Sequence, residues 1–233
     1  MKQPKLTIII PAYNEINTIE ILINKVSRIK VDKQVIIIDD NSNDGTKEII
    51  LSNKDKLDKI IIHEVNRGKG AAIRSAQEFV VGKYVIIQDA DLEYDPEDYY
   101  SLLKKIEANE FKVIYGSRVL KNKDYKIAQN FSHNLRILGN IFLTKLSNLI
   151  NKQNLTDAHT CYKLFDSKLF KSIKLEENDF SFCPEITTKI SKLNIQISEI
   201  PINYNGRSYQ QGKKIVASDG LRAIWTLFKY RYF

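Results

Sequence analysis

Acidic side chains follow a short apolar run near the middle of this sequence. The run at residues 84–87 is followed by Asp89, Asp91 and Glu93. Carboxylate oxygens are the ligands that Mg²⁺ and Mn²⁺ prefer, and such ions usually share phosphate oxygens with a substrate. The three residues therefore predict a site for Mg²⁺ or Mn²⁺ that holds a diphosphate group. The alternative is that the Asp-x-Asp pattern only solvates a turn.

Three other polar segments adjoin apolar runs. They read Pro-Ala-Tyr-Asn-Glu at 11–15, Asp-Asp-Asn-Ser-Asn-Asp-Gly-Thr at 39–46 and Asn-Arg-Gly-Lys-Gly at 66–70. Carboxylates that converge repel one another unless a cation or the hydrogen-bond donors of a ligand lie among them. Because the chain has a net charge of +8, a local acidic cluster predicts a ligand site.

Each piece also has a purely structural interpretation. Glu15 can complement a helix dipole, and Asp44 is best interpreted as a helix cap. The spacing of Gly68 and Gly70 alone is a weak indicator of a phosphate loop. The combination of the segments favours ligand binding, whereas no single segment does.

Strands and helices must bring these segments together. Five apolar runs predict strands buried on both faces, at 6–10, 35–38, 60–62, 84–87 and 113–115. Between them, segments 15–29 and 69–81 have the periodicity of amphipathic helices. This alternation predicts an α/β fold with a mainly parallel sheet. Ligands bind such sheets beyond the carboxyl ends of the strands, where the polar segments fall.

Two later segments are amphipathic as well. Residues 131–150 predict a helix packed on the body of the domain or, alternatively, a helix lying on a bilayer. The last run, 215–233, ends in Lys-Tyr-Arg-Tyr-Phe, and an aromatic and basic end suits a membrane interface. Charged residues interrupt both segments, so no transmembrane helix is predicted.

Composition narrows the class of protein. The 233 residues are 43% hydrophobic and 27% charged, which is typical of one globular domain. An excess of 36 Lys and Arg over 28 Asp and Glu favours anionic partners. Nucleic acid is not expected among them, because the basic residues are scattered and the candidate site is acidic. Two cysteines without metal-ligand spacing, and no secretory signal, favour a cytoplasmic protein.

The ordered motifs resemble those of inverting family 2 glycosyltransferases, which have the GT-A fold. The matching segments are 11–15, 39–46, 66–70, Asp-Ala-Asp-Leu at 89–92 and Gly-Ser-Arg at 116–118. More narrowly, the chain resembles the dolichol-phosphate-mannose synthase and polyprenyl-phosphate glycosyltransferase branch, including segments 157–165 and 199–214. The resemblance implies a single domain with a Rossmann-like, mainly parallel sheet flanked by helices. Its nucleotide-sugar-binding half would be 1–118 and its acceptor-binding half 119–233.

The resemblance also implies roles for individual residues. A GDP- or UDP-hexose donor would be held by Pro11, Tyr13, Glu15, Asp39, Asp40, Lys69, Asp89, Ala90 and Asp91. The divalent ion would be held by Asp89, Asp91 and Glu93, and the mannose synthases are expected to have Gln in place of Glu93. The acceptor phosphate and the leaving diphosphate would be held by Arg118, Arg207 and Lys213. The residues expected to act in catalysis are Asp91, Asp157, Arg118 and Arg207.

Two classes of acceptor are compatible with this chemistry. A polyprenyl phosphate is already an anion, so positioning matters most, and the enzyme would act as a peripheral protein at the cytoplasmic membrane face. A saccharide hydroxyl, as in cell-surface polysaccharide synthesis, needs a base, for which Asp157 is the candidate. The structural alternative for Asp157 is a helix cap after Thr156.

Two further alternatives concern loops. The basic stretch 207–214 either clamps a phosphate and closes over bound ligand or is a solvated connection. A sugar-1-phosphate nucleotidyltransferase would share the sheet and the metal. It is disfavoured, because no Gly-rich, basic loop follows the first strand to hold a triphosphate.

Overall fold

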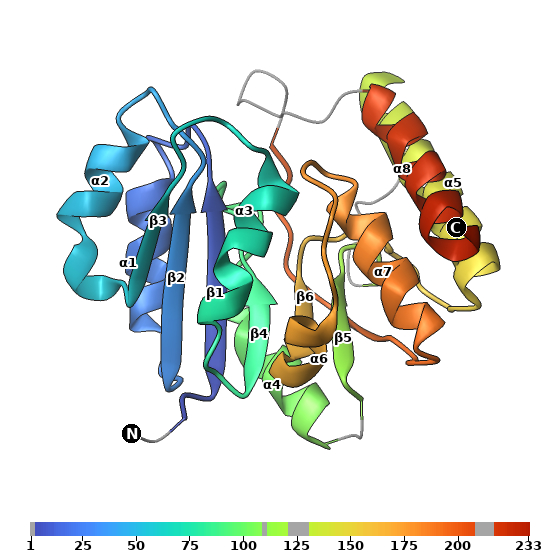
Figure 1. Cartoon of the computed structure of the whole chain (residues 1–233), viewed down its shortest axis with the longest axis horizontal. Helices are drawn as coiled ribbons and strands as arrows, with labels where there is room; N and C mark the ends of the chain where they lie inside the picture. Colours follow the sequence, from blue (N-terminus) through green and yellow to red (C-terminus); the bar gives the residue numbers. More distant parts are fainter. Residues whose placement is uncertain (1–2, 109–110, 121–130, 208–216) are drawn as a thin grey trace.

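A seven-stranded sheet forms the centre of the molecule (Figure 1). The computed structural model describes residues 3–108, 111–120, 131–207 and 217–233, and for 131–136 and 217 it describes the backbone only. The strands are β1 (Leu6–Ala12), β2 (Lys33–Asp39), β3 (Lys59–Ile62), β4 (Tyr84–Ile87), β5 (Val113–Ser117), β6 (Lys163–Asp166) and β7 (Ser198–Pro201). Their order in the sheet is β3-β2-β1-β4-β6-β5-β7. The five strands predicted from the apolar runs are confirmed.

Strand β6 is the exception in a mainly parallel sheet. It runs antiparallel to both of its neighbours, β4 and β5, whereas the other neighbouring strands pair in parallel. The sequence did not predict β6, because Lys163 interrupts its apolar pattern. The structure buries Lys163 completely, and its Nζ donates to the Ala158 carbonyl at 2.9 Å and lies 3.6 Å from the centre of the Tyr115 ring. These contacts compensate the buried charge.

Helices cover both faces of the sheet. They are α1 (Ile19–Arg28), α2 (Thr46–Ser52), α3 (Lys69–Ala76), α4 (Asp98–Ala108), α5 (Phe131–Asn151), α6 (Ser167–Ser172), α7 (Phe182–Lys192) and α8 (Ala217–Tyr232). Successive side chains of a strand point to opposite faces. Accordingly, Ile8 and Ile10 of β1 pack in the cluster with α1, α2 and α4, while Ile9 packs in the cluster with α3, α6 and α7.

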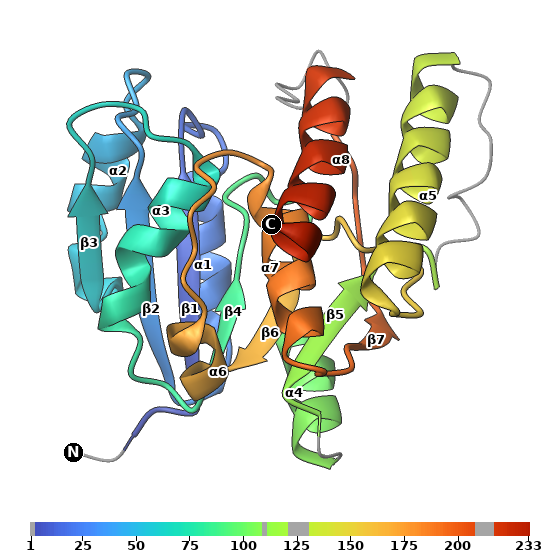
Figure 2. The same cartoon turned by 45° about the vertical axis from the view of Figure 1, so that its right-hand side comes forward.

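Helices α5 and α8 lie at the end of the molecule away from β3 (Figures 1 and 2). They pack against each other, and both pack against α7. Both helices were predicted from their amphipathic patterns, and the structure confirms them. Within the described part of the chain, no helix is both long enough and apolar enough to cross a membrane.

Two glycines allow close backbone contact at the start of α3. A Cβ atom on Gly68 would lie 2.4 Å from the Asn178 carbonyl oxygen, and one on Gly70 would lie 2.3 Å from the Glu177 carbonyl oxygen. Gly68 also has a positive φ of 90°, which side chains rarely adopt. The glycines therefore seat the loop before α3 against the 176–179 segment.

Gly70→Ala is expected to destabilise the protein by about 1–3 kcal/mol, because the new Cβ forces the backbone at Glu177 to move. Gly139→Ala in α5 is the matched control, because a Cβ there meets nothing within 4 Å. Urea titrations give the free energy of unfolding of both variants. An unfolding midpoint of Gly70→Ala equal to that of the parent chain would contradict the close contact.

Candidate active site

The carboxyl ends of β1, β2 and β4 meet at one edge of the sheet, because these strands are parallel neighbours. Glu15 follows β1, Asp39 ends β2, and Asp89 and Asp91 follow β4. Arg207 reaches the same edge from the far end of the sequence, where it contacts Glu15 and Asp91. The acidic segments thus share the edge at which open α/β sheets bind ligands.

Arg207 joins three of these carboxylates. Its Nη1 and Nη2 atoms donate to the two Glu15 oxygens at 2.9 and 3.0 Å, and Nη2 also lies 3.2 Å from Asp91 Oδ2. Its backbone amide donates to Glu93 Oε1 at 2.6 Å. One guanidinium therefore balances a cluster that would otherwise repel itself. The Arg207 Nε atom is buried and has no partner among the described residues.

Lys69 balances the remaining carboxylate of the cluster. Its Nζ forms an ion pair with Asp89 and donates to Cys161 Sγ at 3.0 Å. Burial lowers the pKa of Lys69 but Asp89 raises it, and the pKa lies well above its usual range. The ammonium group therefore stays charged, which suits a phosphate ligand.

Asp39 and Asp40 are adjacent but make different contacts. Asp40 braces the loop before α3, because its carboxylate accepts from the Arg67 and Gly68 amides at 2.8 and 2.7 Å. Asp39 is fully buried, and its Oδ2 accepts from one backbone amide at 3.1 Å. Its Oδ1 is buried without a partner in the described chain. Such an oxygen is costly unless a donor on a ligand reaches it.

A second ion pair lies at the end of β5. Arg118 binds Asp157 through Nε–Oδ2 and Nη2–Oδ1 contacts of 2.7 and 2.8 Å, and Asn140 of α5 donates to Asp157 Oδ1 at 3.2 Å. Glu199 of β7 accepts from the backbone amides of Thr156 and Asp157 at 2.6 and 3.0 Å. Burial by itself raises the pKa of Asp157. The charge and hydrogen bonds of Arg118 have a larger, opposite effect, and the resulting pKa is about 2. A carboxylate with this pKa is a weak base.

A cluster of tyrosine rings connects the two groups of charges. The Tyr94 ring lies 4.7 Å from that of Tyr162 and 5.2 Å from that of Tyr204. The Tyr204 hydroxyl donates to Glu93 Oε2 at 2.7 Å, and its ring lies 5.2 Å from the Arg118 guanidinium. Neither Tyr94 nor Glu199 was predicted as a site residue, because isolated residues on separate segments give no local signal.

The carboxylates after β4 are the residues predicted to hold a divalent cation. Burial, together with Asp89 and Glu93, raises the pKa of Asp91 to about 7, against the opposing effect of Arg207. Arg207 therefore offsets only part of the effect that burial and the neighbouring carboxylates have on Asp91. Among the described residues no three His, Cys, Asp or Glu side chains already form a metal-ligating group. Lys69 and Arg207 hold Asp89 and Asp91 separately, so a cation would have to replace these contacts.

The other predicted residues lie as follows. Pro11 is the next-to-last residue of β1, and Tyr13 directly follows the strand; both are half-buried. Ala90 is buried between the two aspartates of the Asp-x-Asp motif. Lys213 lies outside the described residues, so the predicted phosphate clamp at 207–214 can be examined only at Arg207.

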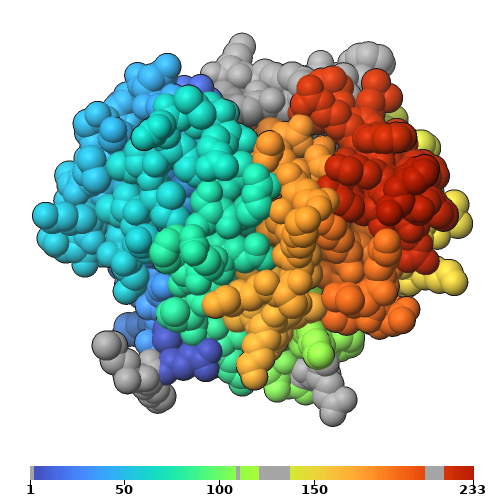
Figure 3. All heavy atoms as spheres, in the orientation of Figure 1, coloured from blue at the N-terminus to red at the C-terminus, as the bar shows by residue number. Residues whose placement is uncertain are grey.

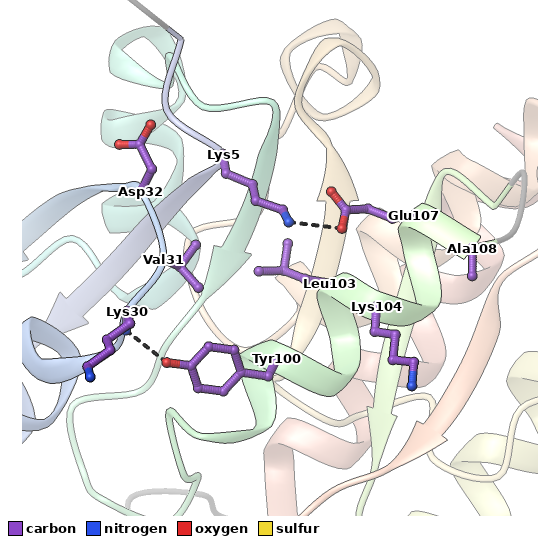
Figure 4. Close-up of a pocket in the computed structure, with 9 residues that line it drawn as sticks. All are labelled: Lys5, Lys30, Val31, Asp32, Tyr100, Leu103, Lys104, Glu107 and Ala108. Atoms are coloured by element: carbon purple, nitrogen blue, oxygen red, sulfur yellow. Dashed lines mark hydrogen bonds and ion pairs between the residues drawn. The ribbon is translucent and has the colours of Figure 1, made fainter.

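A hollow of about 570 Å³ lies at the amino ends of the strands, away from this site (Figure 4). Its wall includes Lys5, which pairs with Glu107 at 2.9 Å, and Tyr100, whose hydroxyl accepts from the Lys30 amide at 2.8 Å. These polar groups already have partners. The hollow also lies at the wrong edge of the sheet for a ligand of an open α/β fold. It is not a candidate active site.

Comparison with known proteins assigns the family. Residues 7–174 match the family described as Glycosyl transferase family 2. The chain belongs to this family. It is therefore a glycosyltransferase, as the ordered motifs predicted. The family 2 match includes all of the predicted site residues except Arg207 and Lys213.

Two similar proteins are named for a lipid phosphate, and a third is named as a hexosyltransferase. The chain is 28% identical to a dolichyl-phosphate beta-glucosyltransferase of Trichomonas vaginalis over an alignment of 245 residues. The alignment covers 98% of this chain and 73% of that protein. It is 29% identical to the dolichyl-phosphate beta-glucosyltransferase of Dictyostelium discoideum, and this alignment covers 85% of this chain and 66% of that protein. It is 28% identical to a low-salt glycan biosynthesis hexosyltransferase of Haloferax volcanii, covering 88% and 48%. The chain thus spans between about half and three quarters of the length of these relatives.

Solved structures confirm the fold. Glucosyl-3-phosphoglycerate synthase from Mycobacterium tuberculosis, in complex with Mg²⁺ and uridine diphosphate, matches with a TM-score of 0.73 at 16% identity, over 98% of this chain and 79% of that one. Mannosyl-3-phosphoglycerate synthase from Rubrobacter xylanophilus matches with a TM-score of 0.70 at 17% identity, over 97% and 72%. The family 2 chain therefore has the predicted GT-A fold.

Proposed function

We propose that this chain is a metal-dependent, inverting hexosyltransferase with a GDP- or UDP-sugar donor and a polyprenyl phosphate acceptor. The observation that carries the proposal is the cluster at the sheet edge, where Arg207 binds Glu15 and Asp91 while Lys69 binds Asp89. One site thus offers carboxylates for a cation and cations for phosphates. A lipid-linked acceptor would require the enzyme to work as a peripheral protein at the cytoplasmic membrane face.

Asp39 supports a nucleoside in this site. Its buried Oδ1 has no partner among the described residues, and an N–H of a base or an O–H of a ribose can donate to it. Pro11 and Tyr13 lie on the neighbouring strand end, beside the pair of Ala12 with Asp39. Similar solved structures carry uridine diphosphate with Mg²⁺ or Mn²⁺, which makes UDP the first nucleotide to test.

Asp89, Asp91 and Glu93 would hold the divalent ion in this proposal. The ion would supply Lewis-acid stabilisation of the negative charge on the leaving diphosphate. Lys69 and Arg207 would exchange their carboxylate partners for phosphate oxygens when the donor binds, because both are charged and both already lie in the cluster. The paired state of the site would therefore be its ligand-free state.

Asp157 favours a phosphate acceptor over a saccharide hydroxyl. It is fully buried, both of its oxygens bind Arg118, and its pKa of about 2 makes it a poor proton acceptor. A polyprenyl phosphate needs no strong base. Arg118, whose side chain is 13% exposed, would contact its phosphate. Relatives named as dolichyl-phosphate glucosyltransferases favour the same acceptor class.

A thermal-shift panel tests the donor. UDP, GDP and their hexose derivatives are added with Mn²⁺ or with EDTA, and ADP is the control nucleotide. A ligand at 100 times its Kd adds about 2.7 kcal/mol of stability. We expect one base to shift the melting temperature, and only with Mn²⁺. If no uridine or guanosine nucleotide stabilises the chain, the proposal is wrong. Product analysis with polyprenyl phosphate or a free saccharide as acceptor then separates the two acceptor classes.

A further inference from the structure

Exposed apolar side chains concentrate on two helices. The large apolar side chains that α5 and α8 expose are Leu138, Ile141, Phe142, Leu149, Leu221, Trp225, Phe228 and Tyr232, here called the α5/α8 surface. The exposed fraction reaches 79% at Leu149 and 73% at Leu221. Scattered single apolar residues on a surface need no explanation, whereas a concentration of them marks an interaction site.

The helical spacing makes each set a continuous stripe. Residues 221, 225, 228 and 232 follow one another at intervals of four, three and four, and so do 138, 142, 145 and 149 in α5. The opposite face of α8 is buried at Ala223, Leu227 and Tyr230. Each helix therefore packs on the protein through one face and exposes a second apolar face. Figure 3 shows that α8 lies on the outside of the molecule.

The charges on these helices suit an anionic surface. The side chains described in α5 and α8 include four cations, Lys145, Arg222, Lys229 and Arg231, and one carboxylate, Asp219. Arg222 pairs with Asp179 at 3.0 Å and Lys229 with Glu177 at 2.8 Å, so the charge offered to an anionic surface comes mainly from Lys145 and Arg231. Lys145 lies within the α5 stripe itself and is exposed. Aromatic and basic side chains side by side are typical of segments that lie in the headgroup region of a bilayer.

The α5/α8 surface adjoins the candidate active site. Asn140 donates to Asp157, which holds Arg118. It lies on the side of α5 that buries Thr144 and Ser147, and the opposite side of the same helix exposes Leu138 and Phe142. An acceptor whose phosphate binds Arg118 could therefore keep its apolar chain in a bilayer that contacts α5. This step rests on the proposed function, whereas the stripes and their charge do not.

We propose that the α5/α8 surface docks on an anionic lipid bilayer and places the active site at the headgroups. The helices would lie in the interface with Trp225, Phe228 and Phe142 in the acyl boundary. Lys145 and Arg231 would contact lipid phosphates. Attraction to acidic lipids contributes about 1 kcal/mol for each Lys or Arg near such a surface and is screened by salt. Binding should therefore need anionic lipid and weaken as salt is added.

Trp225 provides the test, because it is the single tryptophan of the chain and is 63% exposed. The whole chain is mixed with vesicles of phosphatidylcholine alone or with about one third phosphatidylglycerol, without any polyprenyl phosphate. We expect a blue shift of the Trp225 emission, and co-flotation, only with the anionic vesicles. Emission that stays at its aqueous wavelength, with no flotation, would overturn the proposal.

Variants locate the surface while keeping the probe. Leu149→Ser and Leu221→Ser are each expected to weaken vesicle binding about tenfold, and Lys145→Glu to weaken it as well. Val65→Ser, at a residue 63% exposed after β3, is the matched control and should bind as the parent chain does. Equal binding by all four variants would contradict docking through α5 and α8.

Self-association of the chain and a failed donor site each give a different result in these measurements. A blue shift without vesicles that grows with protein concentration would mean that a second copy of the chain covers the surface, and this would overturn the proposal. The nucleotide thermal shift is measured on the same variants in solution. Loss of vesicle binding with an intact nucleotide shift supports the docking surface. A missing nucleotide shift with intact vesicle binding contradicts the proposed donor site alone.

Discussion

Asp91→Asn is expected to lower kcat/KM by about 10²- to 10³-fold, the range found when one preorganised electrostatic contact to a developing charge is removed. Asp91 lies among Asp89, Glu93 and Arg207, and its raised pKa reflects burial first and the negative charges of Asp89 and Glu93 second. The amide keeps the size of the side chain but removes one charge from the proposed cation site. Steady-state kinetics with varied Mn²⁺ concentration measures the loss, and the Mn²⁺ dependence should shift to higher concentration.

Arg207 should remain in place in this variant, because it keeps both contacts to Glu15 and the contact of its amide to Glu93. The melting temperature should therefore change little. Asp55→Asn, on the exposed turn after α2, is the matched control and should leave kcat/KM unchanged. If Asp91→Asn turns over as the parent chain does at every Mn²⁺ concentration, the metal assignment of the Asp-x-Asp motif fails.

Asp157→Ala is expected to destabilise the protein by about 3–5 kcal/mol, because removing one partner of a buried ion pair leaves the other charge uncompensated. Asp157 is fully buried and makes two contacts with Arg118 and one with Asn140. Denaturant unfolding of the variant measures the effect. Asp157→Asn keeps the shape of the side chain and one acceptor oxygen, so its free energy of unfolding should fall by less than that of Asp157→Ala.

The pH dependence of stability provides a second test of the buried Asp157 carboxylate. The pKa of Asp157 falls from its ordinary value of 3.8 to about 2 on folding. A lowered pKa means that its contribution is complete above about pH 4 and is lost as the pH falls through about 2. The parent chain should therefore lose stability more steeply across this window than Asp157→Asn does. If the parent chain and Asp157→Asn lose the same free energy of unfolding across this pH window, Asp157 is not buried and charged as described.

The order of strands and helices in the first half could be predicted from sequence, because continuous Ile and Val runs mark strands that are buried on both faces. β6 could not be predicted this way. Its burial of Lys163 depends on the Tyr115 ring and the Ala158 carbonyl, which are supplied by the tertiary structure. Strands β6 and β7 were therefore revealed only by the structure.

The acidic half of the site was predictable because parallel strands end at a common edge. The cations that pair with it were expected to bind phosphates, and no local pattern indicated that Arg207 would instead bind Glu15, 192 positions away. Asp40 is a similar case, because its two loop contacts are visible only once β2 and the loop before α3 are placed. Long-range pairing of charges is a property of the folded chain.

The position of β6 also bears on how the chain assembles during synthesis. β5 pairs only with β6 and β7 in the described sheet, and β6 supplies its sole link to β4. A ribosome-bound chain that has emerged only as far as residue 118 thus offers β5 no neighbour, although β1 to β4 can already pair. The nascent segment 1–118 would wait with an unpaired strand edge at β4 until β6 arrives, and unpaired edges are prone to misassembly during that interval.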